Sequence, residues 1–418
     1  MGNTRFLRDG WKVMLVTVTI LALILTGMFA LSFKKPVAAK AEVSQEQLQQ
    51  LLNQALLIYL KATSTYMDIS EQTVTLADFN SDSLPIEAIF DVSQTFVANF
   101  KTPDDDPMLA GKIKWLENNR AKLTPNEISV AEVLINQTRK QVQESMTEPF
   151  TGYSNWKITA DSAEDAISGN FKVYLWTVLE HKLAGEIKNW EITDSLLPQI
   201  TEEEVYKTFG DTVKAATHAH QIFLENMKEQ ENTETETQTL IGITAQGFQY
   251  NYNAAANYAN TYTSNTTRTV TCQDQRTGKK ISVRHDPSYY NTSEYSYYAC
   301  GDCANYVSQS LHAGGIPTDS FWYPGSEKWV SATNMRNYML GEGYAYRSQV
   351  ADKGGFIGYG DTSSSTATLY HVLVVVQVSS GNVYVSAHTN DVKNVLFSGA
   401  PSPLITQYYS IYPNPYQG

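Results

Sequence analysis

A cysteine stands where a loop is expected to become a helix. Asp302, which follows Gly301, is a favoured N-cap residue whose carboxylate can accept hydrogen bonds from the free amides of a first helical turn, so Cys303 would occupy the first helical position. A thiol at a helix N-terminus lies at the positive end of the helix dipole, which favours the nucleophilic thiolate. The free N–H groups at the same end can stabilise an oxyanion. Cys303 is therefore a candidate nucleophile, with a buried structural cysteine as the alternative interpretation.

A cysteine nucleophile needs a general base, and the chain offers seven histidines. His312 follows Cys303 on the same expected helix, and a rotation of about 100° per residue carries it to the opposite face. We interpret His312 as structural. His371 begins the run of β-branched and apolar residues 371–378, which predicts a strand buried on both faces with a histidine at its start. We take His371 as the candidate general base.

A second strand is expected directly after the first. Residues 379–382 have the composition of a hairpin turn, and residues 383–390 alternate between two faces, one of them polar. The polar face includes His388 and Asn390, because successive side chains of a strand point to opposite faces. Pairing of the two strands would bring His388 or Asn390 close to His371. The pattern predicts the order nucleophile, base and orienting polar residue along the chain.

The sequence around Cys303 resembles the signature of an amidase domain found in bacterial secreted and surface proteins. Residues 301–317 read GDCANYVSQSLHAGGIP, which is similar to the DCTNFVSQ motif and the AGG turn of that family. Residues 250–259 resemble its opening helix, and residues 321–329 resemble its paired tryptophan region. With the two expected strands, the resemblance covers roughly residues 246–395.

The resemblance has three departures. Ala304 stands where the family usually has Thr, and Ser310 stands where a second cysteine is frequent. Gly354 and Gly355 replace a Gly-Asp pair that usually opens a strand near the cleft. The proposed catalytic residues are retained.

The family is similar to the cysteine, histidine-dependent amidohydrolases and peptidases, which share a papain-like α+β fold. The resemblance therefore implies hydrolysis of an amide through an acyl-enzyme, with cell-wall peptides as the natural substrate. It implies that Cys303 is the nucleophile, His371 the general base and His388 the third polar residue. Asn390 and Asp391 are the alternatives for the third place.

Tyrosine is concentrated in the C-terminal part of the chain, where 21 of the 26 tyrosines lie within residues 242–418. Aromatic rings with polar tips suit peptide and sugar recognition in wet clefts. We therefore take Trp322, Tyr323 and Trp329 as candidate cleft residues, with packing in the core as the alternative.

The charge of the chain is uneven. Acidic residues outnumber basic ones by 43 to 31, but residues 242–418 contain ten of each, so the acidic excess lies in the middle of the chain. Such a surface offers no basic footprint for nucleic acid. His218 and His220 point to nearly opposite faces of an expected helix, and no phosphate-binding loop or metal-ligand cluster is recognisable. We expect no nucleic-acid partner, no metal and no cofactor.

The N-terminal residues predict export. Residues 13–33 form an uncharged apolar stretch of 21 residues, which as a helix would span a bilayer core. Basic residues flank this stretch, and residues 39–41 read Ala-Lys-Ala, which resembles a signal-peptide cleavage site. We expect residues 1–41 to be a signal-anchor or a signal peptide, and the protein to be extracytoplasmic, either anchored in the cell membrane or secreted.

The chain has three cysteines, which suits an exported protein with one disulfide. If Cys272 and Cys300 form a disulfide, Cys303 remains as the free thiol. The C-x-x-C spacing of Cys300 and Cys303 does not by itself indicate a redox role, because no thioredoxin-like βαβ pattern surrounds it.

The fold class expected from these patterns is α+β. Residues 42–230 combine helical periodicity with short aromatic strands, which predicts a helix-rich α+β domain whose role is not readable. Residues 231–241 are polar and lack apolar periodicity, so we interpret them as a linker. Residues 242–418 would form the amidase-like domain with an antiparallel sheet.

The function expected from the sequence is that of an exported or membrane-tethered cysteine amidase or peptidase acting on peptide or cell-wall amides. A wall-associated module that keeps the fold and only binds is an alternative from a different class. An acyltransferase that passes the acyl group to an amine would use the same residues. The sequence does not indicate an oligomeric state.

Overall fold

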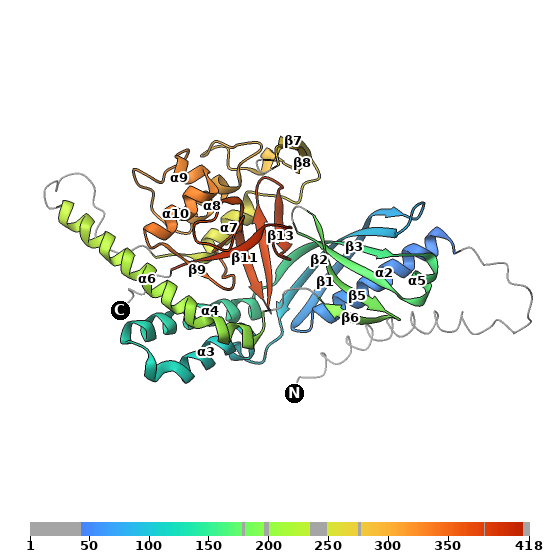
Figure 1. Cartoon of the computed structure of the whole chain (residues 1–418), viewed down its shortest axis with the longest axis horizontal. Helices are drawn as coiled ribbons and strands as arrows, with labels where there is room; N and C mark the ends of the chain where they lie inside the picture. Colours follow the sequence, from blue (N-terminus) through green and yellow to red (C-terminus); the bar gives the residue numbers. More distant parts are fainter. Residues whose placement is uncertain are drawn as a thin grey trace, which may run out of the picture. The chain divides into compact units, whose positions relative to one another are not determined.

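The computed structural model describes residues 43–177, 180–195, 200–234, 249–274, 277–379 and 381–412 (Figure 1). The apolar segment at residues 13–33 and most of the expected linker lie outside these residues. Within the described part of the chain, no helix combines the length and apolarity needed to cross a membrane.

The described residues up to 234 alternate between helices and strands. The helices are α2 (Gln45–Thr63), η1 (Pro103–Asp105), α3 (Pro107–Asn119), η2 (Arg120–Lys122), α4 (Pro125–Thr147), α5 (Ala163–Ser168) and α6 (Glu202–Glu234). The strands are β1 (Met67–Asn80), β2 (Ile86–Ala98), β3 (Phe150–Ala160), β4 (Phe171–Trp176), β5 (His181–Lys188) and β6 (Glu191–Ser195). Thr124 caps α4 in a capping box with Glu127, and a proline at the first helical position fixes where that helix begins.

The described residues from 249 onward carry the expected nucleophile and base. The helices are α7 (Tyr252–Thr261), η3 (Pro287–Tyr289), α8 (Cys303–Ala313), α9 (Glu327–Val330) and α10 (Ala332–Gly341). The strands are β7 (Thr269–Gln273), β8 (Lys280–Arg284), β9 (Ala345–Ser348), β10 (Phe356–Gly360), β11 (Leu369–Ser379), β12 (Asn382–Ala387), β13 (Val392–Leu396) and β14 (Ile405–Ile411).

Twelve strands of the described residues belong to one large sheet, while β7 and β8 form a separate hairpin. The order is β6-β5-β4-β3-β13-β12-β11-β10-β14-β9, with β2 paired to β3 and β1 paired to β2. All of these pairings are antiparallel except the link between β13 and β3, which is a single parallel pairing of Val395 with Tyr153. The protein is therefore a mixed α+β structure with a large, mainly antiparallel sheet, as expected.

Helices cover both faces of the C-terminal strands (Figure 1). One face packs against α8 and α10, in a core that includes Val307, Met335, Val372 and Val374. The opposite face packs against α3 and α6, in a core that includes Met108, Val205, Leu373 and Val375. Strand β11 is thus buried on both faces, as its apolar sequence predicted. The described residues from Gln45 onward form one compact unit, because helices before residue 235 bury one face of the strands that follow residue 249.

The departure at Gly355 has a steric reason. A Cβ atom at this position would lie 2.4 Å from the carbonyl oxygen of Tyr409, so no side chain fits where the backbone enters β10. The preceding Gly354 has a φ of +81°, a conformation that favours glycine. Gly355 lets β10 approach β14 closely, and Gly354 leaves room for Tyr252 of α7.

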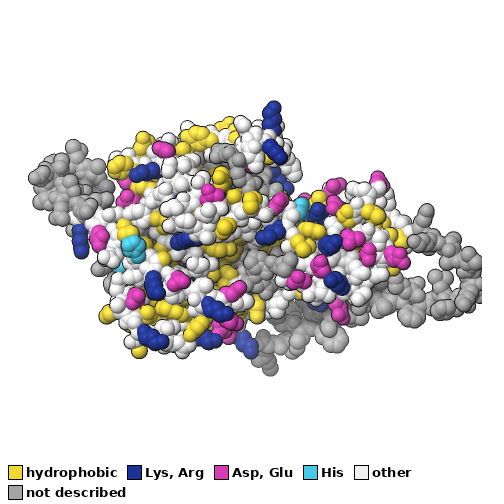
Figure 2. Space-filling model, in the orientation of Figure 1, with side chains coloured by type: hydrophobic (Ala, Val, Ile, Leu, Met, Phe, Trp, Pro, Cys, Tyr) yellow, Lys and Arg dark blue, Asp and Glu magenta, His cyan; other side chains and the backbone are white. Residues whose placement is uncertain are grey.

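The surface shown in Figure 2 carries basic and acidic side chains that are scattered among one another. On this face the basic side chains do not gather into one stripe.

Candidate active site

Cys303 is the first residue of α8, as the sequence predicted, and its side chain is buried. Burial raises the pKa of the Cys303 thiol to about 11, against the opposing effect of the backbone N–H groups of Val372, Ala304 and Cys303 itself. Burial therefore outweighs the helix end, and the Cys303 thiol is neutral near pH 7. The expectation that the position at the helix N-terminus favours the thiolate is wrong. The N–H of Val372 nevertheless places the sulfur beside the start of β11.

His371 lies near the start of β11, directly opposite Tyr359 of β10, where the register of the two strands shifts. Its side chain is buried, and Nε2 has no hydrogen-bond partner among the described residues. Burial lowers the pKa of His371 to about 4, so the imidazole is neutral near pH 7 and has a lone pair available. A buried, unpartnered ring nitrogen is unusual in a core and common where a substrate or a proton is handled.

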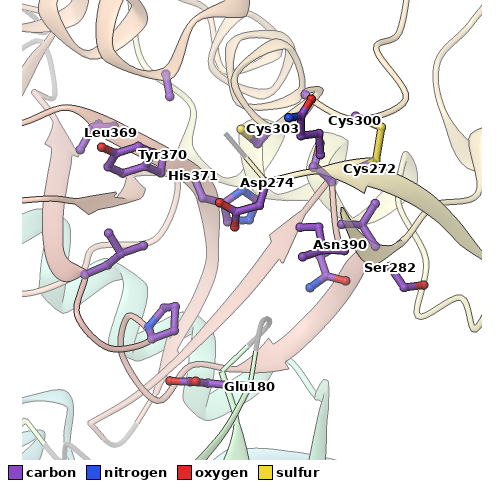
Figure 3. A pocket seen from close by; sticks show the side chains of 18 of the residues that line it. Glu180, Cys272, Asp274, Ser282, Cys300, Cys303, Leu369, Tyr370, His371 and Asn390 are labelled. Atoms are coloured by element: carbon purple, nitrogen blue, oxygen red, sulfur yellow. A yellow bond between two sulfur atoms is a disulfide. The ribbon is translucent and has the colours of Figure 1, made fainter. Parts of the chain in front are cut away.

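Cys303 and His371 line the same cavity, which has a volume of 680 Å³ (Figure 3). Figure 3 shows the two side chains together with Asn390, which comes from the turn after β12. Further walls come from the β7–β8 hairpin, the junction of α9 and α10, and the loop before β14: Cys272, Gln273, Asp274, Ile281, Ser282, Val283, Val330, Ser331, Ala332, Pro401, Ser402 and Leu404.

His388, the predicted third residue, does not reach this cavity. Its Nδ1 lies 2.6 Å from a carboxylate oxygen of Asp302, and its Nε2 lies 2.5 Å from the carbonyl oxygen of Tyr262. Both ring nitrogens therefore lie within hydrogen-bond distance of an oxygen atom. The prediction that His388 orients His371 is wrong, because the side chain of His388 contacts Asp302 at the start of α8 and the carbonyl oxygen of Tyr262 instead.

Asp302 occupies the N-cap position of α8, but its side chain makes no capping hydrogen bond to the first turn. Its Oδ1 accepts instead from the backbone N–H of Tyr298 at 2.8 Å and from Nδ2 of Asn305 at 2.9 Å. Its own N–H donates to Oγ1 of Thr389 at 2.7 Å. The carboxylate that was expected to cap α8 therefore ties the helix start to the turn after β12.

Two tyrosine rings enclose the His388 side chain. Tyr290 stacks on one face with ring centroids 3.6 Å apart, and Tyr306 stacks on the other at 4.0 Å. The Tyr290 hydroxyl also donates to Asp391 at 2.7 Å. The His388 ring is therefore held by oxygen atoms at both nitrogens and by a tyrosine ring on each face.

The two alternatives for the third residue have different positions. Asn390 lines the cavity with His371, and its Oδ1 accepts from the backbone N–H of Arg284 at 3.0 Å. Asp391 is buried away from the cavity, where it accepts from Tyr290 and from the backbone N–H of Asp286. Among the three predicted candidates for the third residue, Asn390 is the one that lines the same cavity as Cys303 and His371.

The three aromatic residues predicted for the cleft lie elsewhere. Trp322 and Trp329 are fully buried, with ring centroids 4.5 Å apart, in the core around α8. Nε1 of Trp329 donates to Oδ1 of Asn305 at 2.8 Å, so this ring helps to hold α8 in place. Tyr323 is exposed and does not line the cavity. The cleft prediction is therefore wrong. The spacing of these residues in the sequence has no periodicity from which a buried ring could be told apart from an exposed one.

The disulfide expected from the cysteine count is present. Cys272 and Cys300 are bonded, and both line the cavity, so the β7–β8 hairpin is braced against the loop that leads into α8. Cys303 is the free cysteine of the chain.

Two carboxylates at the cavity were not anticipated. Asp274 comes from the end of the β7–β8 hairpin, and Glu180 comes from the turn between β4 and β5. Oε1 of Glu180 accepts from the backbone N–H of Ser402 at 3.2 Å, which joins the two walls. Glu180 lies far outside the segment that resembles the amidase family, and no local motif marks it. Among the described residues, no group of three or more His, Cys, Asp or Glu side chains is placed to hold a metal ion.

The fold and this cavity define a mixed α+β protein in which a cysteine at a helix N-terminus and a buried histidine face a common space. Residues 249–411 match the family described as "Putative amidase domain", which confirms the resemblance for the C-terminal part of the chain. A stretch of 112 residues is 32% identical to the uncharacterized protein YjcM of Bacillus subtilis (strain 168) and covers 24% of this chain and 27% of that protein. The match thus spans about a quarter of the relative's length. No solved structure matches the chain significantly.

Breaking the Asp302–His388 pair is expected to destabilise the protein strongly. Asp302→Asn or His388→Gln leaves one partner of a buried pair uncompensated, which costs about 3–5 kcal/mol of unfolding free energy. Urea unfolding of the full-length variants measures this loss. Lys207→Gln, at an exposed ion pair with Glu203, is the control and should cost less than about 1 kcal/mol. A loss from Asp302→Asn no larger than that of the control would contradict the role of the pair.

Acid is expected to destabilise the fold through His371. An unfolded histidine binds a proton below about pH 6.5, whereas folded His371 does so only below about pH 4. Between these values the unfolded state binds more protons, so the unfolding free energy falls as the pH falls. The contribution of His371 reaches about 3 kcal/mol near pH 4.

Unfolding of the wild type and His371→Leu between pH 7 and pH 4 checks this expectation. The variant should lose less stability than the wild type over this range. Its remaining loss should include His181, whose pKa is lowered to about 4 by burial and by nearby Lys157 and Arg284. An identical pH dependence of the two proteins would rule out a buried neutral His371.

Proposed function

We propose that the protein is a cysteine-dependent amidase or peptidase. The observation that carries the proposal is that Cys303, at the N-terminus of α8, lines one cavity with His371, whose buried Nε2 has no partner among the described residues. The family match over residues 249–411 supports hydrolysis of an amide as the reaction. The order of helix and strands around the site supports a papain-like arrangement.

The proposed reaction begins from a neutral pair. His371 takes the proton of the Cys303 thiol as the sulfur bonds to the carbonyl carbon, and the carbonyl electrons move onto oxygen. Collapse of this intermediate breaks the carbon–nitrogen bond, and the protonated His371 gives its proton to the leaving amine. Water, deprotonated by His371, then attacks the thioester, and the departing sulfur regains a proton. General-base catalysis suits a site in which burial disfavours both charged forms.

The backbone around the sulfur supplies candidate donors for the oxyanion. The N–H groups of Cys303 and Ala304 belong to the first turn of α8, which has no intrahelical acceptors for them, and the N–H of Val372 in β11 also interacts with the sulfur. Each well-placed donor of this kind is worth roughly 3 kcal/mol in the transition state. Asn390 is the candidate that would orient the protonated His371, since it lines the same cavity.

The proposed substrate is a peptide amide, with cell-wall peptides as the class favoured by the resemblance. The apolar stretch at residues 13–33 supports export or tethering to the cell membrane, where such substrates lie. The carboxylates of Glu180 and Asp274 at the cavity favour substrates that carry an amino group near the scissile bond.

A wall-associated module that only binds is the rival proposal. The raised pKa of the Cys303 thiol favours it, because a neutral thiol reacts slowly unless a base assists. The two proposals differ in what replacement of Cys303 does to substrate turnover.

Replacement of either proposed catalytic residue is expected to abolish hydrolysis. Full-length protein is incubated with purified peptidoglycan fragments, and released amines and peptides are followed by chromatography and mass spectrometry. Cys303→Ala and His371→Ala should each lower the rate about 10³-fold or more, because nucleophile and base act as a unit. Binding of the fragments should be retained.

The matched control is His312→Ala, at a histidine whose Nδ1 contacts the carbonyl oxygen of Ile316 on the opposite side of α8. This variant should hydrolyse at close to the wild-type rate once its folding is verified. Equal activity of wild type and Cys303→Ala would remove Cys303 from the mechanism and leave the binding module as the better account.

A further inference from the structure

A second cavity, of 270 Å³, lies where the strands before residue 235 meet the C-terminal region. Strands β1, β2 and β3 form its floor, and segments around β8 and β13 border it. The lining residues are Thr73, Thr75, Asp91, Val92, Ser93, Tyr153, Ser154, Asn155, Trp176, Asn265, Thr267, Arg284 and Val395. The proposed catalytic residues are not among them.

The register of β1, β2 and β3 explains the polar floor of this cavity. Thr73 pairs with Ser93, which pairs with Tyr153, and the next row on the same face continues from Thr75 through Asp91 to Asn155. Directly opposite residues of neighbouring strands point to the same face, so the two rows present hydroxyl, amide and carboxylate groups side by side. Thr73, Thr75 and Asp91 are exposed and the other three residues of these rows are half-buried, so the floor is polar and open to solvent.

Arg284 provides the positive charge of the cavity. Its guanidinium carbon lies 4.2 Å from the ring centroid of Trp176, so the two groups stack. The residue is half-buried, and among the described residues its guanidinium has no hydrogen bond or ion pair. Burial lowers the pKa of Arg284, and Asp91 acts on it only through its nearby charge. The guanidinium carries five N–H donors and has no protein acceptor in the described part of the chain. Partial burial of such a group costs free energy, and an anionic ligand would remove that cost.

We propose that this cavity is a binding subsite for a carboxylate group. A carboxylate matches the planar fork of an arginine and accepts two parallel hydrogen bonds from it. The hydroxyls of Thr73, Thr75 and Thr267 can donate to the same group or to neighbouring polar atoms of the ligand. A single guanidinium with the Asp91 carboxylate nearby suits a monoanion better than a doubly charged phosphate.

The subsite is connected to the catalytic cavity through β8. Val283 lines the catalytic cavity, and Arg284, the next residue, lines the second one. The backbone of Arg284 also pairs with Asn390, which accepts at 3.0 Å and donates at 3.1 Å. A carboxylate bound by Arg284 would therefore lie next to the strand β8, which also forms a wall of the catalytic cavity. Such a subsite could hold one end of a ligand whose other end lies in the catalytic cavity.

Isothermal titration of full-length Cys303→Ala protein tests the proposal, because the missing nucleophile prevents consumption of the ligand. One pair of probes is N-acetyl-alanyl-alanine and its C-terminal amide, and the other is glucuronic acid and glucose. We expect at least one carboxylate probe to bind and its neutral counterpart to bind more weakly. Adding Arg284→Gln should weaken binding of that carboxylate at least about tenfold, as loss of a charge-assisted pair does.

Two further variants serve as controls. Arg284→Lys keeps the charge but loses the fork, and it should give an intermediate affinity. Arg120→Gln removes an exposed arginine that pairs with Glu132 and should leave the affinity unchanged. Selective binding of the peptide or of the sugar acid identifies the source of the carboxylate. Absence of binding by both acids, or equal binding to Arg284 and Arg284→Gln proteins, would overturn the proposal without bearing on whether the protein hydrolyses amides.

Discussion

The buried pair of Asp302 and His388 is the interaction on which the geometry of the site depends. It joins the start of α8, which carries Cys303, to the turn after β12, which carries Thr389 and Asn390. A polar pair removed from water is costly unless its remaining donors and acceptors also find partners. Here the Asp302 carboxylate accepts from Tyr298 and Asn305, and the His388 ring lies between two tyrosines. Because all these contacts are directional, they define one position of the helix start relative to the strands.

Burial also determines the protonation states of Cys303 and His371. The same packing that holds Cys303 and His371 in place keeps both groups out of water, and it therefore favours the thiol and the neutral imidazole over an ion pair. Helices α3 and α6 contribute to this burial, since they cover the face of the sheet opposite α8. The region before residue 235 thus acts on the site through the shared core, and through Glu180 it also supplies one wall of the cavity.

The local elements were predictable from the sequence, and the long-range contacts were not. The start of α8 at Cys303 was predicted from Asp302 in the N-cap position, although its side chain makes no capping hydrogen bond, and the doubly buried strand near His371 follows from an apolar run. The strand predicted over residues 383–390 ends at Ala387, so His388 lies in the turn that follows it, and its partner depends on how this turn meets the start of α8. Glu180 comes from a distant segment without periodicity or motif, and although Tyr306 belongs to the motif around Cys303, no local pattern shows that it stacks on His388, so only the folded chain brings these residues together.

The most direct test of the account is acylation of Cys303 by p-nitrophenyl acetate, an activated ester that requires only a competent nucleophile and base. Full-length wild-type protein should release a burst of nitrophenolate and carry one acetyl group on the peptide that contains Cys303, as read by mass spectrometry after an acid quench. The burst should be absent in Cys303→Ala and much slower in His371→Ala. Acetylation at another residue, or an equally fast burst in His371→Ala, would contradict the claim that these two residues form a nucleophile and base.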